Sequence, residues 1–362
     1  MSTRETNRIW RLWQVETAIA CNLDCIMCPW HGVRKDKNHD GIMSPLVWDA
    51  LLPYLSQVHS IDFSGGGEPL LQPRLAEWVR EATDSGCETG FLTNGTLLYP
   101  DTAEKMISSG IDWIAISMDG ATEDVYESIR RGGDFRKVRD HILAMAKLRN
   151  AKVPKIAINF VLMSVNAHEL EDMVRLTADL GADQLNVKQC DVIRGNAGKG
   201  FGLFEKKETS DIRGLKKRLS KAKRLAKRLK IEMTQFSFTP DEQPVCGQDP
   251  TGSLFICQDG YISPCINLAY GGPTLFFGKD DYMPTIQYGR APEDDLLNLW
   301  RSDTCRHYRT RFLERIRAHD TVIFESAFEP SWPKLQETFQ SAKDAMPPAP
   351  EGCRVCHYLY NV

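Results

Sequence analysis

The run Cys21-Asn22-Leu23-Asp24-Cys25-Ile26-Met27-Cys28 places three cysteines at the spacing Cys-x3-Cys-x2-Cys. Four-iron clusters that a protein holds by itself normally take four thiolates, so three would leave one iron open for a ligand that is not protein. The run follows the apolar stretch Leu12–Ala20, which we expect to form a strand. These features predict an open iron–sulfur site at the end of the first strand.

A zinc site and three buried thiols are the alternatives for this run. Zinc sites are usually built from paired Cys-x2-Cys or Cys/His units. The nearby His31 and His39 lie in a polar loop, and neither stands at zinc spacing from the cysteines. The spacing therefore favours the open cluster.

The cysteine run near the N-terminus resembles that of the radical S-adenosylmethionine (radical SAM) superfamily. The resemblance implies a 4Fe–4S cluster whose open iron binds the amino and carboxylate groups of SAM. It also implies an enzyme, fed by a reductase or flavodoxin-type electron donor, that cleaves SAM to methionine and a 5′-deoxyadenosyl radical. The cofactor would carry the chemistry while the protein supplies placement and exclusion of water.

From residue 10 to about 230, strand-like and helix-like stretches alternate. The expected strands are Leu12–Ala20, His59–Phe63, Glu88–Leu92, Trp113–Ser117, Lys155–Leu162 and Gln184–Lys188. The expected helices are Ser44–Ser56, Arg74–Ser85, Pro100–Ser109, Phe135–Arg149, Ala167–Leu180 and Asp211–Leu229. Such alternation indicates a parallel sheet with right-handed crossovers. We predict an α/β fold in which residues 1–230 form a partial (β/α)6 TIM-type barrel, close to the core that radical SAM proteins share.

The second expected strand is followed by Ser64-Gly65-Gly66-Gly67-Glu68-Pro69. Glycines allow a close backbone approach, and a carboxylate beside them could accept hydrogen bonds from an ammonium group. Gly66, Gly67, Glu68 and Pro69 resemble the GGEP-type motif that holds the SAM amino group in the radical SAM family. One departure from that family is Met27, where an aromatic residue often packs on the adenine; methionine can also pack on a ring.

Further polar residues at the ends of the later strands are candidates for the same pocket. By resemblance, Asn94 lines the floor of the site and Ser117 contacts the SAM ribose or carboxylate. Arg130 fits the arginine that neutralises the SAM carboxylate, with Arg131 as the alternative. Asn159 is expected to face the barrel interior, as a SAM contact or as a core amide.

After residue 230 the pattern breaks, and six of the eleven cysteines lie there. We expect residues 231–362 to form a small, irregular α+β, cysteine-rich domain. The spacing from Cys246 through Gly260 to Cys265 resembles the opening of a SPASM domain, and the late Cys-x2-Cys pair fits its shortened "twitch" form. The resemblance implies a second, auxiliary 4Fe–4S cluster, with a four-thiolate zinc site as the alternative. The implied ligands are Cys246, Cys265, Cys353 and Cys356, with Cys257 and Cys305 as spare candidates.

Three residues just after the sixth strand are catalytic candidates. Cys190 could return a hydrogen atom to a substrate radical, as thiols do in radical SAM epimerases, and Lys188 or Asp191 could transfer a proton in a dehydrogenase. A packed thiol is the plainer interpretation of Cys190. The segment Asp211–Lys230 predicts a helix with an apolar stripe and a basic outer face, which is either solvated or docks an acidic partner.

Composition narrows the function classes. A net charge of −3 argues against a nucleic-acid partner, and no apolar stretch approaches the roughly 20 residues that span a bilayer. Without a recognisable signal peptide, a cytoplasmic protein is expected. We predict a peptide- or protein-modifying radical SAM enzyme; the alternative substrate is a small sugar or aminocyclitol, in a dehydrogenase or epimerase. A non-catalytic metal scaffold would leave Gly66–Pro69 without a purpose.

Overall fold

A ten-stranded sheet runs through the whole molecule in this computed structural model, which describes residues 8–35, 41–190, 198–203, 209–326 and 332–362. The strand order is β12-β9-β8-β1-β2-β3-β4-β5-β6-β7. Neighbours from β8 to β7 are parallel, while β9 pairs antiparallel with both β8 and β12. The strands of this sheet are β1 Trp10–Val15, β2 Val58–Asp62, β3 Glu88–Thr93, β4 Trp113–Ser117, β5 Lys155–Leu162, β6 Gln184–Gln189, β7 Glu232–Gln235, β8 Ser253–Ile256, β9 Tyr261–Ser263 and β12 Gly289–Arg290.

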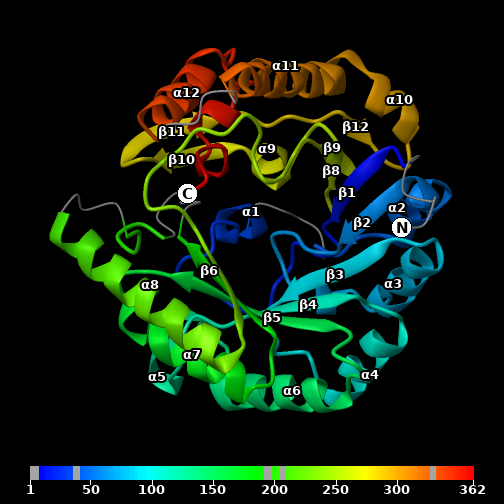
Figure 1. Cartoon of the computed structure of the whole chain (residues 1–362). Helices are drawn as coiled ribbons and strands as arrows, with labels where there is room; N and C mark the ends of the chain where they lie inside the picture. The colour runs from blue at the N-terminus through cyan, green and yellow to red at the C-terminus, as the bar shows by residue number, and fades with distance from the viewer. Residues whose placement is uncertain (1–7, 36–40, 191–197, 204–208, 327–331) are drawn as a thin grey trace.

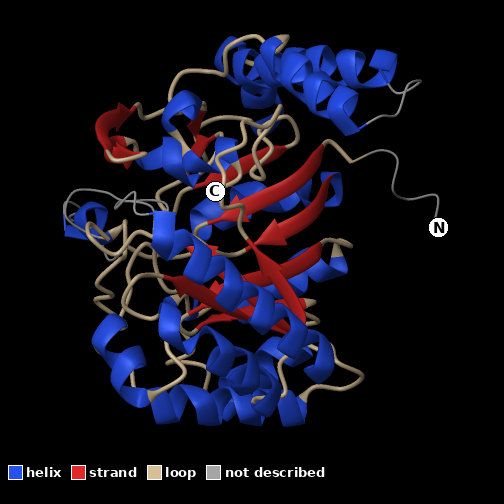
Figure 2. Ribbon diagram, turned by 60° about the vertical axis from the view of Figure 1, so that its left-hand side comes forward, coloured by secondary structure: helices blue, strands red, loops and turns tan. Residues whose placement is uncertain are grey.

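Helices cover the outside of the curved parallel part, as Figures 1 and 2 show. This arrangement confirms the predicted α/β partial barrel. All six predicted strands and all six predicted helices are present, with α1, α5 and β7 in addition. The helices up to this point are α1 His31–Lys35, α2 Pro45–Leu51, α3 Leu75–Asp84, α4 Pro100–Ser108, α5 Glu123–Ile129, α6 Phe135–Leu148, α7 Leu170–Asp179 and α8 Thr209–Leu229.

Side-chain alternation along β5 shows which face of the sheet the helices cover. Ile156, Ile158 and Phe160 point to one face and are fully buried, whereas Asn159 and Val161 on the other face are only partly buried. Successive strand residues point to opposite faces. The apolar face therefore packs under the helices, and the polar face borders the barrel interior.

The first strand is shorter than predicted, because β1 ends at Val15 rather than at Ala20. Beyond it the chain leaves the sheet and pairs with a different segment. Ala18 forms an isolated antiparallel bridge with Ile42, and the amides of Ile19 and Ala20 donate to the Gly41 carbonyl at 2.7 and 3.1 Å. The apolar pattern of residues 18–20 thus reflects burial without strand pairing to the barrel.

The C-terminal part is less irregular than predicted. Its β8–β9 hairpin, which the turn at 258–260 predicts, adds to the barrel sheet beside β1. It also has a separate hairpin and four helices: β10 Gly272–Phe276, β11 Lys279–Met283, α9 Ile266–Tyr270, α10 Leu296–Arg301, α11 Asp303–Ser326 and α12 Trp332–Asp344. Charged residues obscure α11 in the sequence, although Cys305, Tyr308, Phe312 and Arg315 are buried at helical spacing along it.

Aromatic side chains join this C-terminal part to the barrel. Trp10 and Trp13 on β1 are fully buried with their ring centroids 5.1 Å apart, and Trp300 on α10 meets Trp10 edge-on at 5.9 Å. Large aromatic side chains dominate core energetics because each buries so much apolar surface. The core is therefore continuous across the two parts of the chain.

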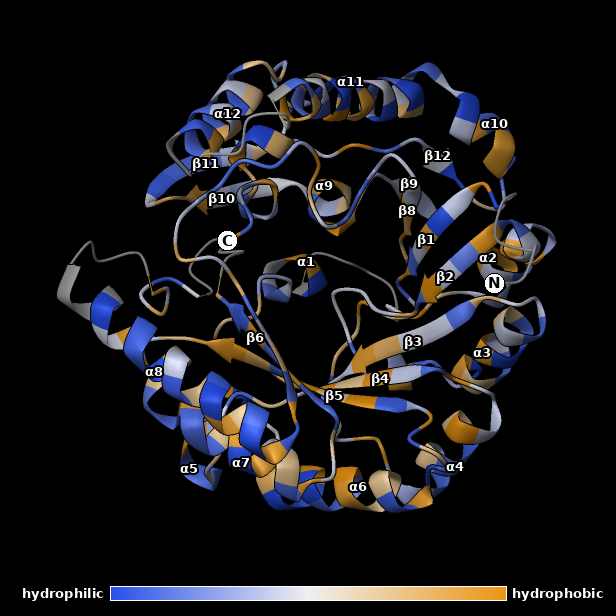
Figure 3. Ribbon diagram, in the orientation of Figure 1, coloured by the Kyte–Doolittle hydropathy of each residue, from blue (hydrophilic) through white to orange (hydrophobic). Residues whose placement is uncertain are grey.

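The helix α8 packs its apolar stripe inward and leaves a basic face outward. Leu215, Leu219, Ala222 and Leu225 are buried, whereas Leu229 at the end is 40% exposed. Figure 3 shows the hydrophilic colouring along the outer side of α8, next to α7. The amphipathic helix predicted for this segment is confirmed.

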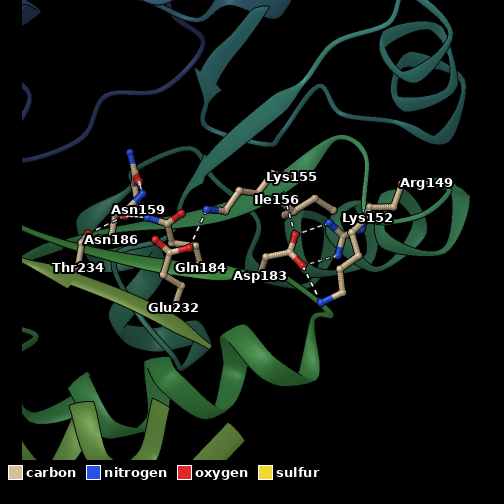
Figure 4. A network of polar contacts seen from close by, with 10 residues as sticks. All are labelled: Arg149, Lys152, Lys155, Ile156, Asn159, Asp183, Gln184, Asn186, Glu232 and Thr234. Atoms are coloured by element: carbon tan, nitrogen blue, oxygen red, sulfur yellow. Dashed lines mark hydrogen bonds and ion pairs between the residues drawn. The ribbon is translucent and has the colours of Figure 1, made fainter. Parts of the chain in front are cut away.

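At the N-terminal end of β5 and β6, Asp183 collects donors from several elements (Figure 4). Arg149 contacts both carboxylate oxygens, one at 3.2 Å, and the Ile156 amide donates at 3.0 Å. Exposed Lys152 lies 3.4 Å away. Burial by itself would raise the pKa of Asp183, but the hydrogen bonds from Arg149 and Ile156 leave that pKa below its ordinary value.

Within the described residues, no helix is long and apolar enough to cross a membrane.

Replacing Asp183 by Asn should lower the free energy of unfolding at pH 7 by about 1–3 kcal/mol, because the Arg149 guanidinium loses its charged partner. The folded-state pKa of Asp183 is depressed, so its stabilisation is present above the unfolded value of about 3.9 and is lost as the pH falls through the folded pKa. Urea unfolding at pH 7 and near pH 3 measures both effects. Lys152→Gln is the control and should cost under about 0.5 kcal/mol; an equal cost for the two variants would contradict the assignment.

Candidate active site and auxiliary cysteine site

The segment with Cys21, Cys25 and Cys28 lies beyond the C-terminal end of β1. It is held against the end of α5, because the amides of Asp24 and Ile26 donate to the carbonyls of Arg131 and Ile129, each at 3.0 Å. Active sites of such barrels lie at the C-terminal ends of the strands. The loop therefore occupies the position expected for the chemistry.

Each of the three thiols lies near a nitrogen donor from a different element. Asn94 Nδ2, after β3, is 3.8 Å from Cys21 Sγ. Arg130 Nη1, after α5, is 3.9 Å from Cys25 Sγ, and Arg34 Nη2, on α1, is 3.3 Å from Cys28 Sγ. Two cations and an amide thus surround the sulfurs, which favours the thiolate that metal binding needs.

Without a bound metal, burial of Cys25 and Cys21 favours the neutral thiol over the thiolate. It raises the pKa of Cys25 to about 11, although the Arg130 charge acts in the opposite direction. The pKa of Cys21 is also raised by burial, with Arg34 lowering it in part. Iron binding would therefore release protons from these thiols.

The glycines beside this loop approach protein atoms at close range. A Cβ on Gly65 would lie 2.2 Å from Glu16 Cγ, one on Gly66 would lie 2.4 Å from Ile19 Cδ1, and one on Gly67 would lie 2.2 Å from the Ala20 carbonyl oxygen. The segment 65–67 therefore packs directly on residues 16–20, which lead into the cysteine run. Close approach explains the glycines, as predicted, but the neighbour that the structure describes is the chain itself.

Glu68 is almost completely buried and accepts three hydrogen bonds. Its Oε1 accepts from Thr93 Oγ1 at 2.6 Å and from the Leu70 amide at 3.1 Å, and its Oε2 accepts from the Asn94 amide at 2.8 Å. Burial raises the pKa of Glu68, while the Asn94 and Thr93 hydrogen bonds lower it in part. This carboxylate ties the end of β2 to the end of β3; Pro69 follows in the first turn of a short 3-10 helix.

Arg130 forms a buried ion pair with Asp119, with Nη2 and Oδ2 2.7 Å apart. Asp119 also accepts from the Val161 amide at 2.7 Å. Burial raises the pKa of Asp119, and the Arg130 charge lowers it in part. The pair lies next to Cys25, so Arg130 joins the end of β4 to the cysteine run; Arg131 contributes its carbonyl instead of its side chain.

A row of polar residues crosses the barrel interior in strict register. Ser117 on β4 lies opposite Asn159 on β5, Asn159 opposite Asn186 on β6, and Asn186 opposite Thr234 on β7. Asn186 Nδ2 donates to Asn159 Oδ1 at 2.9 Å, and Thr234 Oγ1 donates to Asn186 Oδ1 at 2.7 Å (Figure 4). The row leads from the side of the cysteine run to the outermost strand.

The catalytic candidates differ in their surroundings. Cys190 packs with Cys25 and Met27 in a small apolar cluster, so it lies close to the cysteine run. Lys188 is exposed near the C-terminal end of β6, and Asp191 lies outside the described residues. Cys87, in contrast, is a core thiol on the other side of the barrel.

Four cysteines line one small cavity in the C-terminal part: Cys246, Cys265, Cys353 and Cys356. Burial raises the pKa of Cys265 and Cys353, and the neighbouring thiols of the set raise both further. The spare candidates Cys257 and Cys305 are buried elsewhere and do not line this cavity.

The donor chemistry of both cysteine sets suits iron–sulfur clusters. Among the described side chains, no group of three or more His, Cys, Asp or Glu residues is placed to hold a single metal ion.

Sequence reasoning missed three residues of these sites. Arg34 belongs to a five-residue helix with no pattern of its own, and Glu16 was assigned to a strand that ends before it. Arg315 is one of many arginines on α11. Nothing in the sequence around these three charged residues indicates that they are buried, because Arg315 lies among other charged residues and Glu16 follows an apolar strand.

Comparison with known proteins agrees with this geometry. The sequence model of the Radical SAM superfamily matches residues 15–177, which include the cysteine run, Gly66–Pro69 and Arg130. The tungsten-containing aldehyde ferredoxin oxidoreductase cofactor-modifying protein of Pyrococcus furiosus is 24% identical over 302 residues, or 82% of each chain.

Two further proteins are similar over different extents. The PqqA peptide cyclase of Bradyrhizobium diazoefficiens is 28% identical over 51% of this chain, which spans about half (48%) of the cyclase. The crystal structure of Streptococcus suis SuiB bound to S-adenosylmethionine superposes with a TM-score of 0.63 at 16% identity, covering 82% of this chain and 66% of SuiB. Residues 15–177 therefore form a radical SAM domain, the domain of a superfamily of enzymes.

Proposed function

We propose that this enzyme binds SAM at a cluster held by Cys21, Cys25 and Cys28 and removes a hydrogen atom from a peptide or protein substrate. The observation that carries the proposal is the placement of these three thiols beside Gly66–Pro69, each near a separate nitrogen donor. When bound, the cluster supplies the electron that cleaves SAM to methionine and a 5′-deoxyadenosyl radical. A reductase or flavodoxin-type protein would deliver that electron.

The pocket residues would then divide the contacts to SAM. Gly66, Gly67 and Glu68, with Pro69 fixing the turn, would face the amino group, and Asn94 would line the floor. Glu68 is held in place by its three donors and so offers a fixed negative charge. Fixed dipoles and charges need no reorganisation when a ligand binds.

The polar groups on β4 and β5 would contact the rest of SAM. Ser117 lies at the end of its strand, next to the buried Arg130–Asp119 pair. Asp119 already neutralises much of the charge of Arg130. Arg130 would therefore contact the SAM carboxylate together with the segment that carries Cys21, Cys25 and Cys28. Asn159, beside Ser117, would present its amide from the barrel interior.

An auxiliary 4Fe–4S cluster would occupy the cavity lined by Cys246, Cys265, Cys353 and Cys356. The cysteines reach it from three segments, and Arg315 links the one before Cys246 to the one before Cys353. Its Nε donates to the Pro244 carbonyl at 3.1 Å, and its Nη1 donates to the Pro347 carbonyl at 2.5 Å. Four thiolates would leave this cluster without an open iron, so it would serve as an electron acceptor or relay.

A peptide or protein substrate is supported by two observations. Among the relatives, the PqqA peptide cyclase acts on a peptide, and α8 offers a basic face to an acidic partner. Cys190, packed beside the cysteine run, would return a hydrogen atom, or Lys188 and Asp191 would move a proton. A small sugar or aminocyclitol is the second candidate, because a single auxiliary cluster suits a dehydrogenase.

Iron, sulfide and zinc analysis with EPR after anaerobic reconstitution tests the two clusters. We expect about eight irons in the wild type and about four in the Cys21/Cys25/Cys28→Ala variant. With dithionite, only the wild type should convert SAM to 5′-deoxyadenosine. Zinc in place of the second four irons would refute the auxiliary cluster, and a wild type without iron or SAM cleavage would refute the whole proposal.

Replacing Arg315 by Lys should empty the auxiliary site. Lysine keeps the charge but cannot reach the carbonyls of Pro244 and Pro347 with a planar fork. We expect about four irons per chain in place of about eight, and a loss of about 2 kcal/mol in the free energy of unfolding.

The matched control is Arg311→Lys, one turn earlier on α11, where a half-exposed arginine pairs with Glu314 at 3.2 Å. It should keep its iron and lose under about 0.5 kcal/mol. Full iron content in Arg315→Lys would show that Arg315 does not position the auxiliary ligands.

A further inference from the structure

A single buried carboxylate joins the glycine loop of the barrel to the C-terminal part. Glu16 follows β1 directly and is fully buried. Its Oε1 accepts from the Gly66 amide at 2.8 Å. Its Oε2 accepts from the Gln258 amide at 3.3 Å and from the Tyr270 hydroxyl.

The two partners on Oε2 belong to the segment that carries an auxiliary cysteine. Gln258 lies in the turn of the β8–β9 hairpin, and Tyr270 is the last residue of α9. That helix begins directly after Cys265, which is its N-cap residue. Only the four residues 266–269 therefore separate Cys265 from the tyrosine whose hydroxyl contacts Glu16.

Apolar packing reinforces the same junction. Trp30, two residues after Cys28, lies 5.5 Å from Tyr270 between ring centroids. A Cβ on Gly66 would come within 3.0 Å of the Trp30 ring. The cysteine run, the glycine loop and α9 thus meet around Glu16.

The Tyr270 hydroxyl is the donor in its hydrogen bond with Glu16. Burial raises the pKa of Tyr270, and the neighbouring Glu16 charge raises it further, so the protonated hydroxyl is favoured. Without that hydroxyl, Oε2 of Glu16 would keep only the longer hydrogen bond from the Gln258 amide, at 3.3 Å. Loss of a hydrogen bond to a buried carboxylate is costly.

We infer that Glu16 is a positioning residue that couples SAM binding in the barrel to the auxiliary segment through Tyr270. The inference rests on the proposed function for the identity of the two sites. Tyr270 anchors one oxygen of Glu16, the other oxygen anchors the Gly66 amide, and that amide sets the loop that would hold the SAM amino group. Removing the tyrosine hydroxyl should therefore loosen the glycine loop through Glu16.

The test compares Tyr270→Phe with wild-type holoenzyme. Hydrogen–deuterium exchange on peptides covering residues 64–69 should be about tenfold faster in the variant. The Kd for SAM should be about tenfold higher. A tenfold change corresponds to about 1.4 kcal/mol, which is the scale of one hydrogen bond. Iron content should be unchanged. In Glu16→Gln the side chain keeps one oxygen that can accept from the Gly66 amide. The oxygen that accepts from Gln258 and Tyr270 becomes an amide nitrogen, which cannot accept. Exchange of residues 64–69 should therefore be faster and the Kd for SAM higher in this variant as well.

The matched control is Tyr261→Phe, in the same aromatic cluster, where the ring packs under Arg290 at 5.0 Å. It should leave both quantities at wild-type values. Unchanged exchange in Tyr270→Phe and Glu16→Gln would overturn the inference, and so would faster exchange with an unchanged Kd. If the wild type itself binds no SAM while the loop still exchanges faster in Tyr270→Phe, the proposed function fails and the positioning by Glu16 stands.

Discussion

The pairing of β1 with neighbours on both sides governs the arrangement of the two cysteine sites. Leu12, Trp13 and Gln14 are in parallel register with β2 on one side and with β8 on the other. Because β1 is enclosed, the chain that leaves its C-terminal end must run between the barrel and the C-terminal part. Residues 16–28 follow that route and carry Glu16, which contacts both parts, and the three thiols of the barrel site.

The charges around Cys25 explain why Arg130 and Asp119 lie beside it. Burial raises the pKa of Cys25, which disfavours the thiolate, while Arg130 provides the opposing charge. Arg130 is itself buried and needs Asp119 as its partner. A thiol, a guanidinium and a carboxylate from three separate segments thus form one unit, because any one of them alone in this environment would be costly.

Local sequence patterns predicted the barrel well, since its strands and helices alternate with recognisable periodicity and several helices have cap residues. Ser44 caps α2 with its side chain, and Gly86, Gly110 and Gly181 end helices with positive φ, as their positions indicate. The patterns failed where tertiary contacts decide the outcome. Residues 18–20 look like strand because they are apolar, yet their partner is the segment around Gly41. The helix α11 is hidden because its buried face includes Arg315.

For the candidate site, motif positions indicated most of the residues that meet at the ends of the strands. The sequence could not indicate Glu16, Arg34 or Arg315, because what makes each of them important is a partner far along the chain. Glu16 reaches residues 66, 258 and 270, and Arg315 reaches 242–244 and 347. Such contacts become visible only once the sheet has brought these segments together.

The β1–β8 pairing also bears on how this protein can be divided. A fragment that ended after β7 would lose β8 and leave one side of β1 with unpaired amides and carbonyls beside the buried faces of Trp10 and Trp13. An uncovered, apolar edge strand is a template for pairing with other chains. The barrel half expressed alone would therefore tend to aggregate.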